Sequence, residues 1–196
     1  YPLRRQRQMC IRDRRWSIIH AYLPLEKKTH VIDDMAKYHV IACVNPVFNW
    51  QEGAAFANNL GPERLARTQP FRSYLNAGVM LTSGSDYGVT SHNPWIGLYA
   101  LLTRRDQTTG KVYGAEETLG IADALRTYTI NGAFLTYDEK KRGSIEPGKA
   151  ADLIVVDVPD VRELEKTPEL CFQMADKVLL TLIDGKVRYG KQGTAF

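Results

Sequence analysis

Two residues combine a reactive side chain with a position at the end of a β-prone run. His20 ends the run 16–20, and Asp86 follows Gly84 just after the apolar run 79–83. In parallel α/β barrels, functional side chains sit at the carboxyl ends of the strands, so His20 and Asp86 are expected to face one mouth. Imidazole and carboxylate groups suit a divalent ion such as Zn²⁺. These two residues therefore predict a metal site.

Each of the two residues also has a purely structural interpretation. A lone histidine at a strand end commonly serves as a hydrogen-bonded structural residue, and an aspartate after Gly-Ser commonly caps the turn or helix that follows. Three more residues are candidates for contact with a substrate at the same mouth. Asn45 and Trp50 follow the second apolar run, and His92 lies in the loop before Pro94. The alternative for His92 is a solvent-exposed loop residue.

Three β-prone runs alternate with helical stretches over residues 16–142. The run 40–44 is continuously apolar, which is typical of a strand buried on both faces of a parallel sheet, and the run 79–83 is expected to form another buried strand. Apolar residues at helical spacing and terminal Gly or Pro signals predict helices between and after the strands. These helices are expected at 31–38, 51–60, 70–76, 94–103 and 118–135. The alternation indicates an α/β fold with a parallel sheet.

Residues 143–196 have a different character. A turn-rich segment at 143–149 leads into an apolar run at 152–157. The run 178–183, the dipeptide Asp184-Gly185 and the run 186–189 predict a hairpin with a type I′ turn. This part of the chain is therefore expected to form a small antiparallel β element.

Composition indicates a globular domain. The chain has 196 residues, of which 44% are hydrophobic, and no run of eighteen apolar residues that would span a membrane. The N-terminus lacks the apolar region of a secretory leader. The three cysteines, at positions 10, 43 and 171, form no CxxC pair. Reduced thiols and a cytoplasmic location are therefore expected.

The formal charge of +4 is concentrated at one end of the chain. Residues 1–15 hold six Arg and one Asp, and the remainder holds 20 Lys and Arg against 21 Asp and Glu. A basic arm that binds nucleic acid is one interpretation. No aromatic interleaving or groove-binding motif accompanies the arginines, so we favour a disordered or foreign tail. We expect neither a nucleic-acid nor a membrane partner, and no oligomeric state follows from the sequence.

Four motifs occur in an order typical of one known family. They are Ile-His-Ala at 19–21, Leu-Gly-Pro-Glu-Arg at 60–64, Ala-Gly-Val at 77–79 with Ser-Gly-Ser-Asp at 83–86, and GSIEPGKAADL at 143–153. Over about residues 15–190 the chain resembles the metal-dependent amidohydrolase superfamily. It is most similar to the amidohydrolase-3 branch, which includes N-substituted formamide deformylase-like enzymes. The segment 143–157 is the most specific marker.

The resemblance implies a (β/α)₈ TIM barrel beside a small β-sandwich built from both chain termini. The strands at 16–20, 40–44 and 79–83 would then be barrel strands six, seven and eight. Residues 16–142 would form a partial hydrolase barrel, and residues 143–196 would form the C-terminal portion of the sandwich.

The resemblance also implies a chemistry for the two strand-end residues. His20 matches the strand-six metal-site histidine, and Asp86 matches the strand-eight aspartate that binds metal and transfers protons. The implied activity is hydrolysis of carbon–nitrogen bonds in small, non-peptide substrates with one or two divalent ions, Zn²⁺ being the expected metal. Asp86 would move a proton from the attacking water to the departing nitrogen. In one-metal members His20 would instead hydrogen-bond the water or the oxyanion.

The family pattern is incomplete in this chain. Its strand-one His-x-His pair, its strand-four bridging residue and its strand-five histidine have no counterpart before residue 16. Two ligands are fewer than the three that catalytic zinc sites usually have. We therefore expect a C-terminal fragment that is inactive alone, binds metal poorly and exposes apolar strand edges. The rival hypotheses are a truncated chain with a structural or binding role and a basic-tailed nucleic-acid binder.

Overall fold

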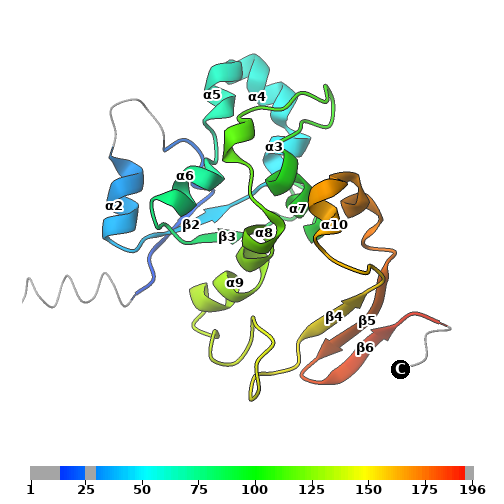
Figure 1. The fold of residues 1–196 in the computed structure, drawn as a ribbon. Helices are drawn as coiled ribbons and strands as arrows, with labels where there is room; N and C mark the ends of the chain where they lie inside the picture. Colours follow the sequence, from blue (N-terminus) through cyan, green and yellow to red (C-terminus); the bar gives the residue numbers. More distant parts are fainter. Residues whose placement is uncertain (1–13, 25–29, 193–196) are drawn as a thin grey trace, which may run out of the picture.

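The computed structural model describes residues 14–24 and 30–192, which form a parallel and an antiparallel sheet (Figure 1). The parallel sheet has the order β1-β2-β3, and the antiparallel sheet has the order β4-β5-β6. The strands are β1 (Ser17–Ile19), β2 (Ile41–Val44), β3 (Leu81–Ser83), β4 (Leu153–Val156), β5 (Val178–Ile183) and β6 (Lys186–Gly190). The predicted α/β class is confirmed. Asp184 and Gly185 both have positive φ, as a type I′ turn requires.

Helices connect the strands in the order expected for a parallel α/β sheet. Among the described residues, one helix lies between β1 and β2, and four short helices lie between β2 and β3. Their bounds are α2 (Val31–Lys37), α3 (Val47–Gln51), α4 (Gly53–Leu60), α5 (Pro62–Ala66) and α6 (Phe71–Asn76). After β3 come α7 (Pro94–Thr103), the 3₁₀ turn η1 (Ala115–Glu117), α8 (Ile121–Tyr128) and α9 (Ile130–Leu135). Between β4 and β5 lie α10 (Glu163–Lys166) and the 3₁₀ segment η2 (Pro168–Gln173).

Two helix predictions were wrong in their boundaries. The stretch predicted at 51–60 divides at Glu52 between the end of α3 and α4, and Asp106 from a distant loop accepts a 2.9 Å hydrogen bond from the Ala54 backbone N–H in the first turn of α4. The stretch predicted at 118–135 breaks at Thr129, which has φ −122° and ψ −101°. The Thr129 hydroxyl donates to the carbonyl of Leu125, a local bond that competes with helical geometry.

The core lies where α7 packs against the strands and the neighbouring helices. The apolar face of this helix is buried, because Leu98, Tyr99 and Leu101 are 2%, 3% and 0% exposed. Tyr99 also contacts Phe172 of η2, with ring centroids 4.6 Å apart. The segment between β4 and β5 is therefore joined to the strand–helix part through an aromatic contact.

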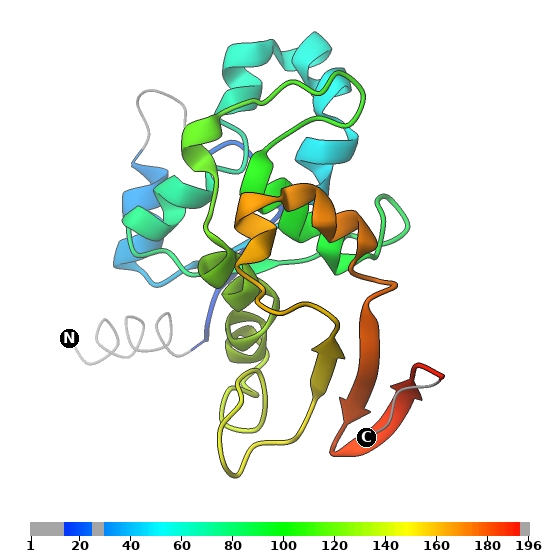
Figure 2. The ribbon, with the colours of Figure 1, turned by 45° about the vertical axis from the view of Figure 1, so that its right-hand side comes forward.

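Apolar side chains are exposed on the outer strand of the parallel sheet and on the antiparallel sheet. Ile18 and Ile19 of β1 are 41% and 71% exposed, since β1 pairs only with β2 among the described residues. The antiparallel sheet extends away from the strand–helix part (Figure 2), and its Ile154, Val187 and Tyr189 are exposed. Exposure of this kind is expected where a further element covers a sheet.

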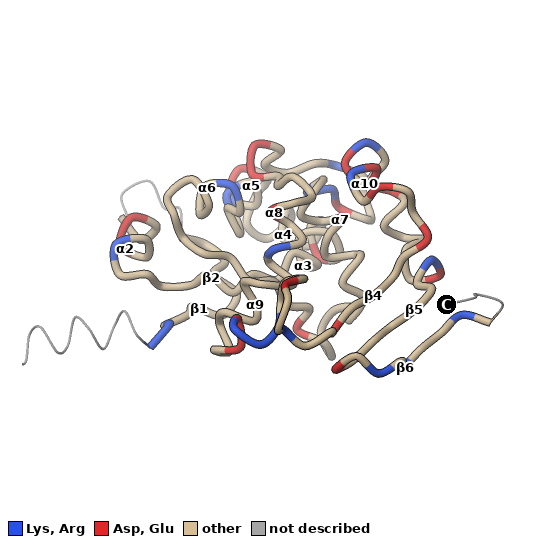
Figure 3. The backbone as a smooth tube through the Cα atoms, turned by 60° about the horizontal axis from the view of Figure 1, so that its bottom comes forward, with Lys and Arg blue, Asp and Glu red and all other residues tan. Residues whose placement is uncertain are grey.

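Charged residues of both signs are interspersed along the described backbone (Figure 3). Arg15 forms an ion pair with Glu139 at 2.6 Å, and its guanidinium lies over the rings of Phe134 and Tyr137. The rest of the predicted basic tail, residues 1–13, lies outside the described residues. None of the helices in the described part combines the length and apolar content needed to cross a bilayer.

The contact between α7 and α8 gives a test of the packing. A Cβ atom added to buried Gly97 would lie 1.8 Å from the Tyr128 hydroxyl, whereas one added to Gly132 of α9 would have no neighbour within 4 Å. We expect Gly97→Ala to lower the free energy of unfolding by about 1–3 kcal/mol. Gly132→Ala should leave it unchanged or raise it by up to about 1 kcal/mol. Urea unfolding measures both, and equal stability of the two variants would contradict the described packing.

Candidate active site

The carboxyl ends of the three parallel strands are connected by one side chain. Asn45, directly after β2, accepts a 2.8 Å hydrogen bond at its Oδ1 from His20 Nδ1 after β1, and its Nδ2 donates to the Gly84 carbonyl after β3 at 3.1 Å. The strand register, with Ile19 beside Cys43 and one further step to β3, brings these ends together. The structure thus places His20 and Asn45 in contact. Asn45 also bonds to Gly84, which lies two positions before Asp86 in the chain.

The backbone is strained where the candidate residues lie. His20, Ala21 and Asp86 have φ values of 67°, 37° and 53°, in the left-handed region that non-glycine residues rarely adopt. Hydrogen bonds hold these conformations, because the buried Tyr74 hydroxyl donates to the Ala21 carbonyl at 2.9 Å and the Val89 N–H donates to the Asp86 carbonyl at 3.0 Å. Such conformations cluster at functional sites and carry a strain of order 1–3 kcal/mol each.

A buried glutamine supports Asn45 from beneath the strand ends. The Gln69 side chain accepts from the Asn45 N–H at 2.7 Å and donates to the Asn45 carbonyl at 3.0 Å. It also donates to Asn49 Oδ1 at 3.3 Å, and Gln69 is 0% exposed. Gln69 could not be recognised from the sequence, because a polar side chain gives no local sign that it folds inward.

A buried arginine holds the segment that carries Gln69. Arg104 is 1% exposed and donates to the carbonyls of Gln69 and Thr68, each at 3.0 Å, as well as to those of Ala66 and Tyr113. Burial lowers the pKa of Arg104 to about 10, so the guanidinium stays charged at neutral pH. Like Gln69, Arg104 carries no sign in the sequence that its side chain is buried.

The other two predicted substrate contacts lie in different surroundings. The exposed His92 ring packs edge-on against Tyr87, the residue after Asp86, with centroids 5.0 Å apart. Trp50 instead packs against Phe172 of η2, with centroids 5.7 Å apart. The aromatic residue that approaches His20 is Phe48, at 5.9 Å between centroids. His92 is therefore joined to the loop of Asp86, and Trp50 to the C-terminal segment.

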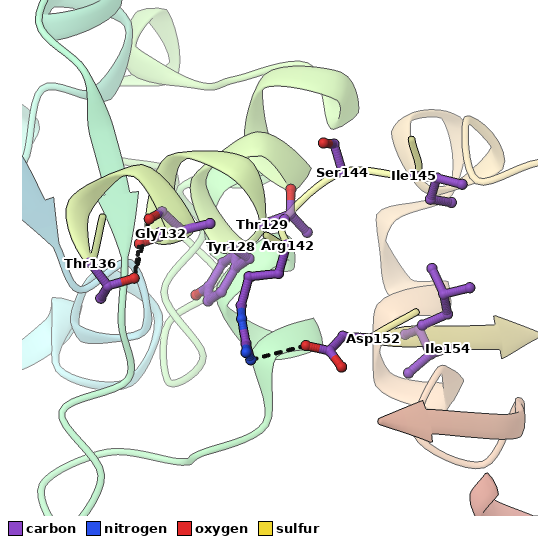
Figure 4. A pocket seen from close by; sticks show the side chains of 12 residues that line it. Tyr128, Thr129, Gly132, Thr136, Arg142, Ser144, Ile145, Asp152 and Ile154 are labelled. Atoms are coloured by element: carbon purple, nitrogen blue, oxygen red, sulfur yellow. Dashed lines mark hydrogen bonds and ion pairs between the residues drawn. The ribbon is translucent and has the colours of Figure 1, made fainter. Parts of the chain in front are cut away.

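A hollow of about 470 Å³ lies elsewhere, between α8, α9, the 142–145 loop and β4 (Figure 4). Its lining includes Tyr128 and Ile154, together with an Arg142–Asp152 ion pair of 3.0 Å. None of His20, Asn45 and Asp86 lines it. The hollow therefore lies between the helices α8 and α9 and the start of the antiparallel sheet, away from the ends of the parallel strands.

The donor types at the strand ends suit a divalent metal, although their number is small. His20 and Asp86 are both exposed, and imidazole nitrogen with carboxylate oxygen is a common zinc ligand combination. Asn45 occupies His20 Nδ1, which leaves Nε2 for a metal ion. Within the described ranges, no group of three or more His, Cys, Asp or Glu side chains is placed to hold an ion. The described residues thus fit as part of a ligand set.

The fold is shared with hydrolases of known structure. A metal-dependent hydrolase of uncharacterised function from Pyrococcus horikoshii OT3 aligns with a TM-score of 0.62 and 25% identity, over 72% of this chain and 28% of its own. An adenosine deaminase from Xanthomonas campestris with bound zinc aligns with a TM-score of 0.61 and 22% identity, over 96% of this chain and 40% of its own. The chain therefore has the α/β fold of a class of hydrolases.

The chain belongs to the amidohydrolase family, whose sequence model matches residues 3–189, and the resemblance given by its motifs is confirmed. It is 28% identical over 183 residues to the protein LONG AFTER FAR-RED 3 of Arabidopsis thaliana, covering 91% of this chain and 29% of that protein. It is 30% identical over 169 residues to N-substituted formamide deformylase of Arthrobacter pascens, covering 82% and 29%. The chain thus spans less than a third of these relatives.

Two adjacent arginines test the support beneath the site. We expect Arg104→Lys to lower the free energy of unfolding by about 2 kcal/mol or more, because an ammonium group cannot reach the same set of buried carbonyls. Arg105→Lys should change it by less than about 0.5 kcal/mol, since Arg105 is exposed. Chemical denaturation of the two variants measures the difference, and similar values would rule out the described role of Arg104.

Proposed function

We propose that the protein containing this chain hydrolyses carbon–nitrogen bonds of small, non-peptide amides with a divalent metal, Zn²⁺ being the first candidate. The observation that carries the proposal is the Asn45 side chain, which joins the His20 end of β1 to the Gly84 end of β3, just before Asp86. Membership of the amidohydrolase family and the zinc-bound deaminase of similar fold support it. On this proposal β1, β2 and β3 are strands six, seven and eight of a barrel.

His20 through Nε2 and Asp86 through its carboxylate are the residues of this chain that would hold the metal. When bound, a divalent ion supplies Lewis acidity, which acidifies water and polarises a substrate carbonyl. Any further ligands would come from outside the described residues, since a catalytic zinc site usually has three protein ligands.

Asp86 performs the proton transfer in this proposal. Its exposed carboxylate accepts a proton from the water that attacks the amide carbon and then delivers that proton to the departing nitrogen. Amide nitrogen is a poor leaving group, so hydrolysis depends on its protonation. The left-handed backbone at Asp86 fixes the direction in which the carboxylate leaves the chain.

The substrate class is small amides such as N-substituted formamides, by analogy with the deformylase relative. We retain His92 as a substrate contact, because it packs on Tyr87 beside Asp86 and both rings are exposed. Asn45 and Trp50, proposed for the same role from the sequence, have their side chains engaged within the protein.

A non-catalytic role for the isolated chain is the second candidate. It is favoured by the finding that the described residues bring no three metal-binding side chains together. Titration of the 196-residue chain with Zn²⁺ should therefore give a binding free energy well short of the roughly 10–16 kcal/mol of complete structural sites. Tight binding of one Zn²⁺ that is abolished by both His20→Ala and Asp86→Ala would contradict this expectation.

Substitution of Asp86 tests the catalytic proposal in the complete gene product that contains this chain. Asp86→Asn should lower kcat for a hydrolysed amide by about 10²–10⁴-fold, because the amide side chain cannot transfer the proton. The matched control is Asp123→Asn on α8, where the carboxylate only pairs with Arg72 at the surface at 3.4 Å. Amide hydrolysis that survives Asp86→Asn at the wild-type rate would eliminate the proposed mechanism.

A further inference from the structure

The orientation of the Asn45 side chain is determined by its partners. The group within 3.1 Å of the Gly84 carbonyl oxygen must be the NH₂ group, because two carbonyl oxygens repel each other at that distance. The Asn45 oxygen then faces His20 Nδ1 at 2.8 Å. An amide oxygen can only accept a hydrogen bond, so His20 Nδ1 must carry a proton and donate it.

This contact selects one tautomer of His20. With the proton on Nδ1, the neutral imidazole has its free lone pair on Nε2. Nε2 has no hydrogen-bond partner within the part of the chain that the structure describes, and His20 is exposed. Phe48 packs at 5.9 Å from the same ring and restricts its rotation. The ring is therefore held with a free nitrogen on the side away from Asn45.

Asn45 is itself held in position by the buried side chain of Gln69. Both side-chain polar atoms of Gln69 bond to the backbone of Asn45, and the Gln69 N–H donates to the Tyr22 carbonyl at 2.6 Å. Gln69 has φ 42°, a left-handed conformation in a residue that precedes Pro70. Strain of this kind persists only where the surroundings over-determine the conformation. Arg104 completes those surroundings by binding the Gln69 carbonyl.

We propose that Asn45 and Gln69 are positioning residues: Asn45 fixes the tautomer and the ring orientation of His20, and Gln69 fixes Asn45. The use of the free Nε2 as a metal ligand depends on the proposed function, whereas the positioning of His20 does not. A partner of this kind for a ligating histidine changes metal affinity or activity by about 10–100-fold. The proposal replaces the role of Asn45 as a substrate contact, because its amide already bonds to both neighbouring strand ends.

The test uses ¹⁵N NMR of histidine side chains in the full 196-residue chain, at a pH where the imidazoles are neutral. Long-range ¹H–¹⁵N spectra distinguish a protonated Nδ1 from a protonated Nε2, and His20→Gln identifies the signals of His20 among the four histidines. We expect the wild-type chain to show His20 protonated at Nδ1. Protonation at Nε2 in the wild-type chain would overturn the proposal without any variant being needed.

Three variants separate positioning from general destabilisation. Asn45→Ala should shift the His20 signals to the average of two exchanging tautomers. Asn45→Asp should keep Nδ1 protonated, because a carboxylate oxygen accepts the same bond even though the bond to the Gly84 carbonyl is lost. Gln69→Ala should move the His20 signals part of the way. The control is Asn131→Ala, since Asn131 donates one comparable bond to the Leu81 carbonyl at the other end of β3, at 2.8 Å. His20 signals that respond alike to Asn45→Ala and Asn131→Ala would overturn the proposal.

A second readout uses the complete gene product. Asn45→Ala should weaken retention of Zn²⁺ against a chelator by about 10–100-fold, with Asn131→Ala unchanged. Loss of the Nδ1 proton without any change in Zn²⁺ retention would show that His20 is positioned but not a ligand, which contradicts the proposed function and not the positioning. Zn²⁺ retention that falls while the His20 tautomer stays unchanged would overturn the positioning role.

Discussion

The candidate site depends on how the buried segment that ends at Gln69 satisfies its polar groups. This segment passes beneath the strand ends, and its carbonyls at Ala66, Thr68 and Gln69 all accept from the Arg104 guanidinium. A buried carbonyl without a partner costs about 1–3 kcal/mol, so one arginine removes several such penalties at once. The same geometry presents the Gln69 side chain to Asn45. The conformation of the strand ends therefore depends on the hydrogen bonds that pair these buried backbone groups.

A buried, hydrogen-bonded arginine restricts the arrangement of the surrounding backbone more than an apolar core residue does. Apolar packing tolerates substitution by side chains of similar volume, whereas Arg104 bonds to carbonyls in one arrangement only. Its left-handed backbone, with φ 50°, also places it at the end of α7 facing back toward those carbonyls. The helix α7 therefore links the core to the strand ends, because its C-terminal cap bonds to the β2–β3 connection. The apolar part of α7 contributes stability, and its C-terminal cap Arg104 orients the β2–β3 connection.

The elements of the fold were predictable where their signals are local. The continuous apolar run 40–44 predicted β2, the largely apolar run 79–83 predicted β3, and the Asp184-Gly185 turn predicted the β5–β6 hairpin. His20 and Asp86 were predicted as candidate residues because the ends of β-prone runs can be located in the sequence. The Asn45 contacts to His20 and Gln69 were not predictable, since they join residues 25 and 24 positions apart and depend on tertiary packing. The break at Thr129 was not predicted, because the spacing of apolar residues gives no sign of a side chain that hydrogen-bonds to a carbonyl of its own helix.

The strand that carries His20 is held differently from its neighbours. β2 and β3 are mostly buried, whereas all three residues of β1 are exposed, so β1 gains little from apolar burial. Hydrogen bonds from Ile41 to the Trp16 carbonyl and from Tyr74 to the Ala21 carbonyl hold its two ends. Each such bond contributes about 0.5–1.5 kcal/mol net. A ligand bound by residues at the ends of both β1 and β3 would therefore stabilise β1 by linkage, which makes the order of this strand and the occupancy of the site interdependent.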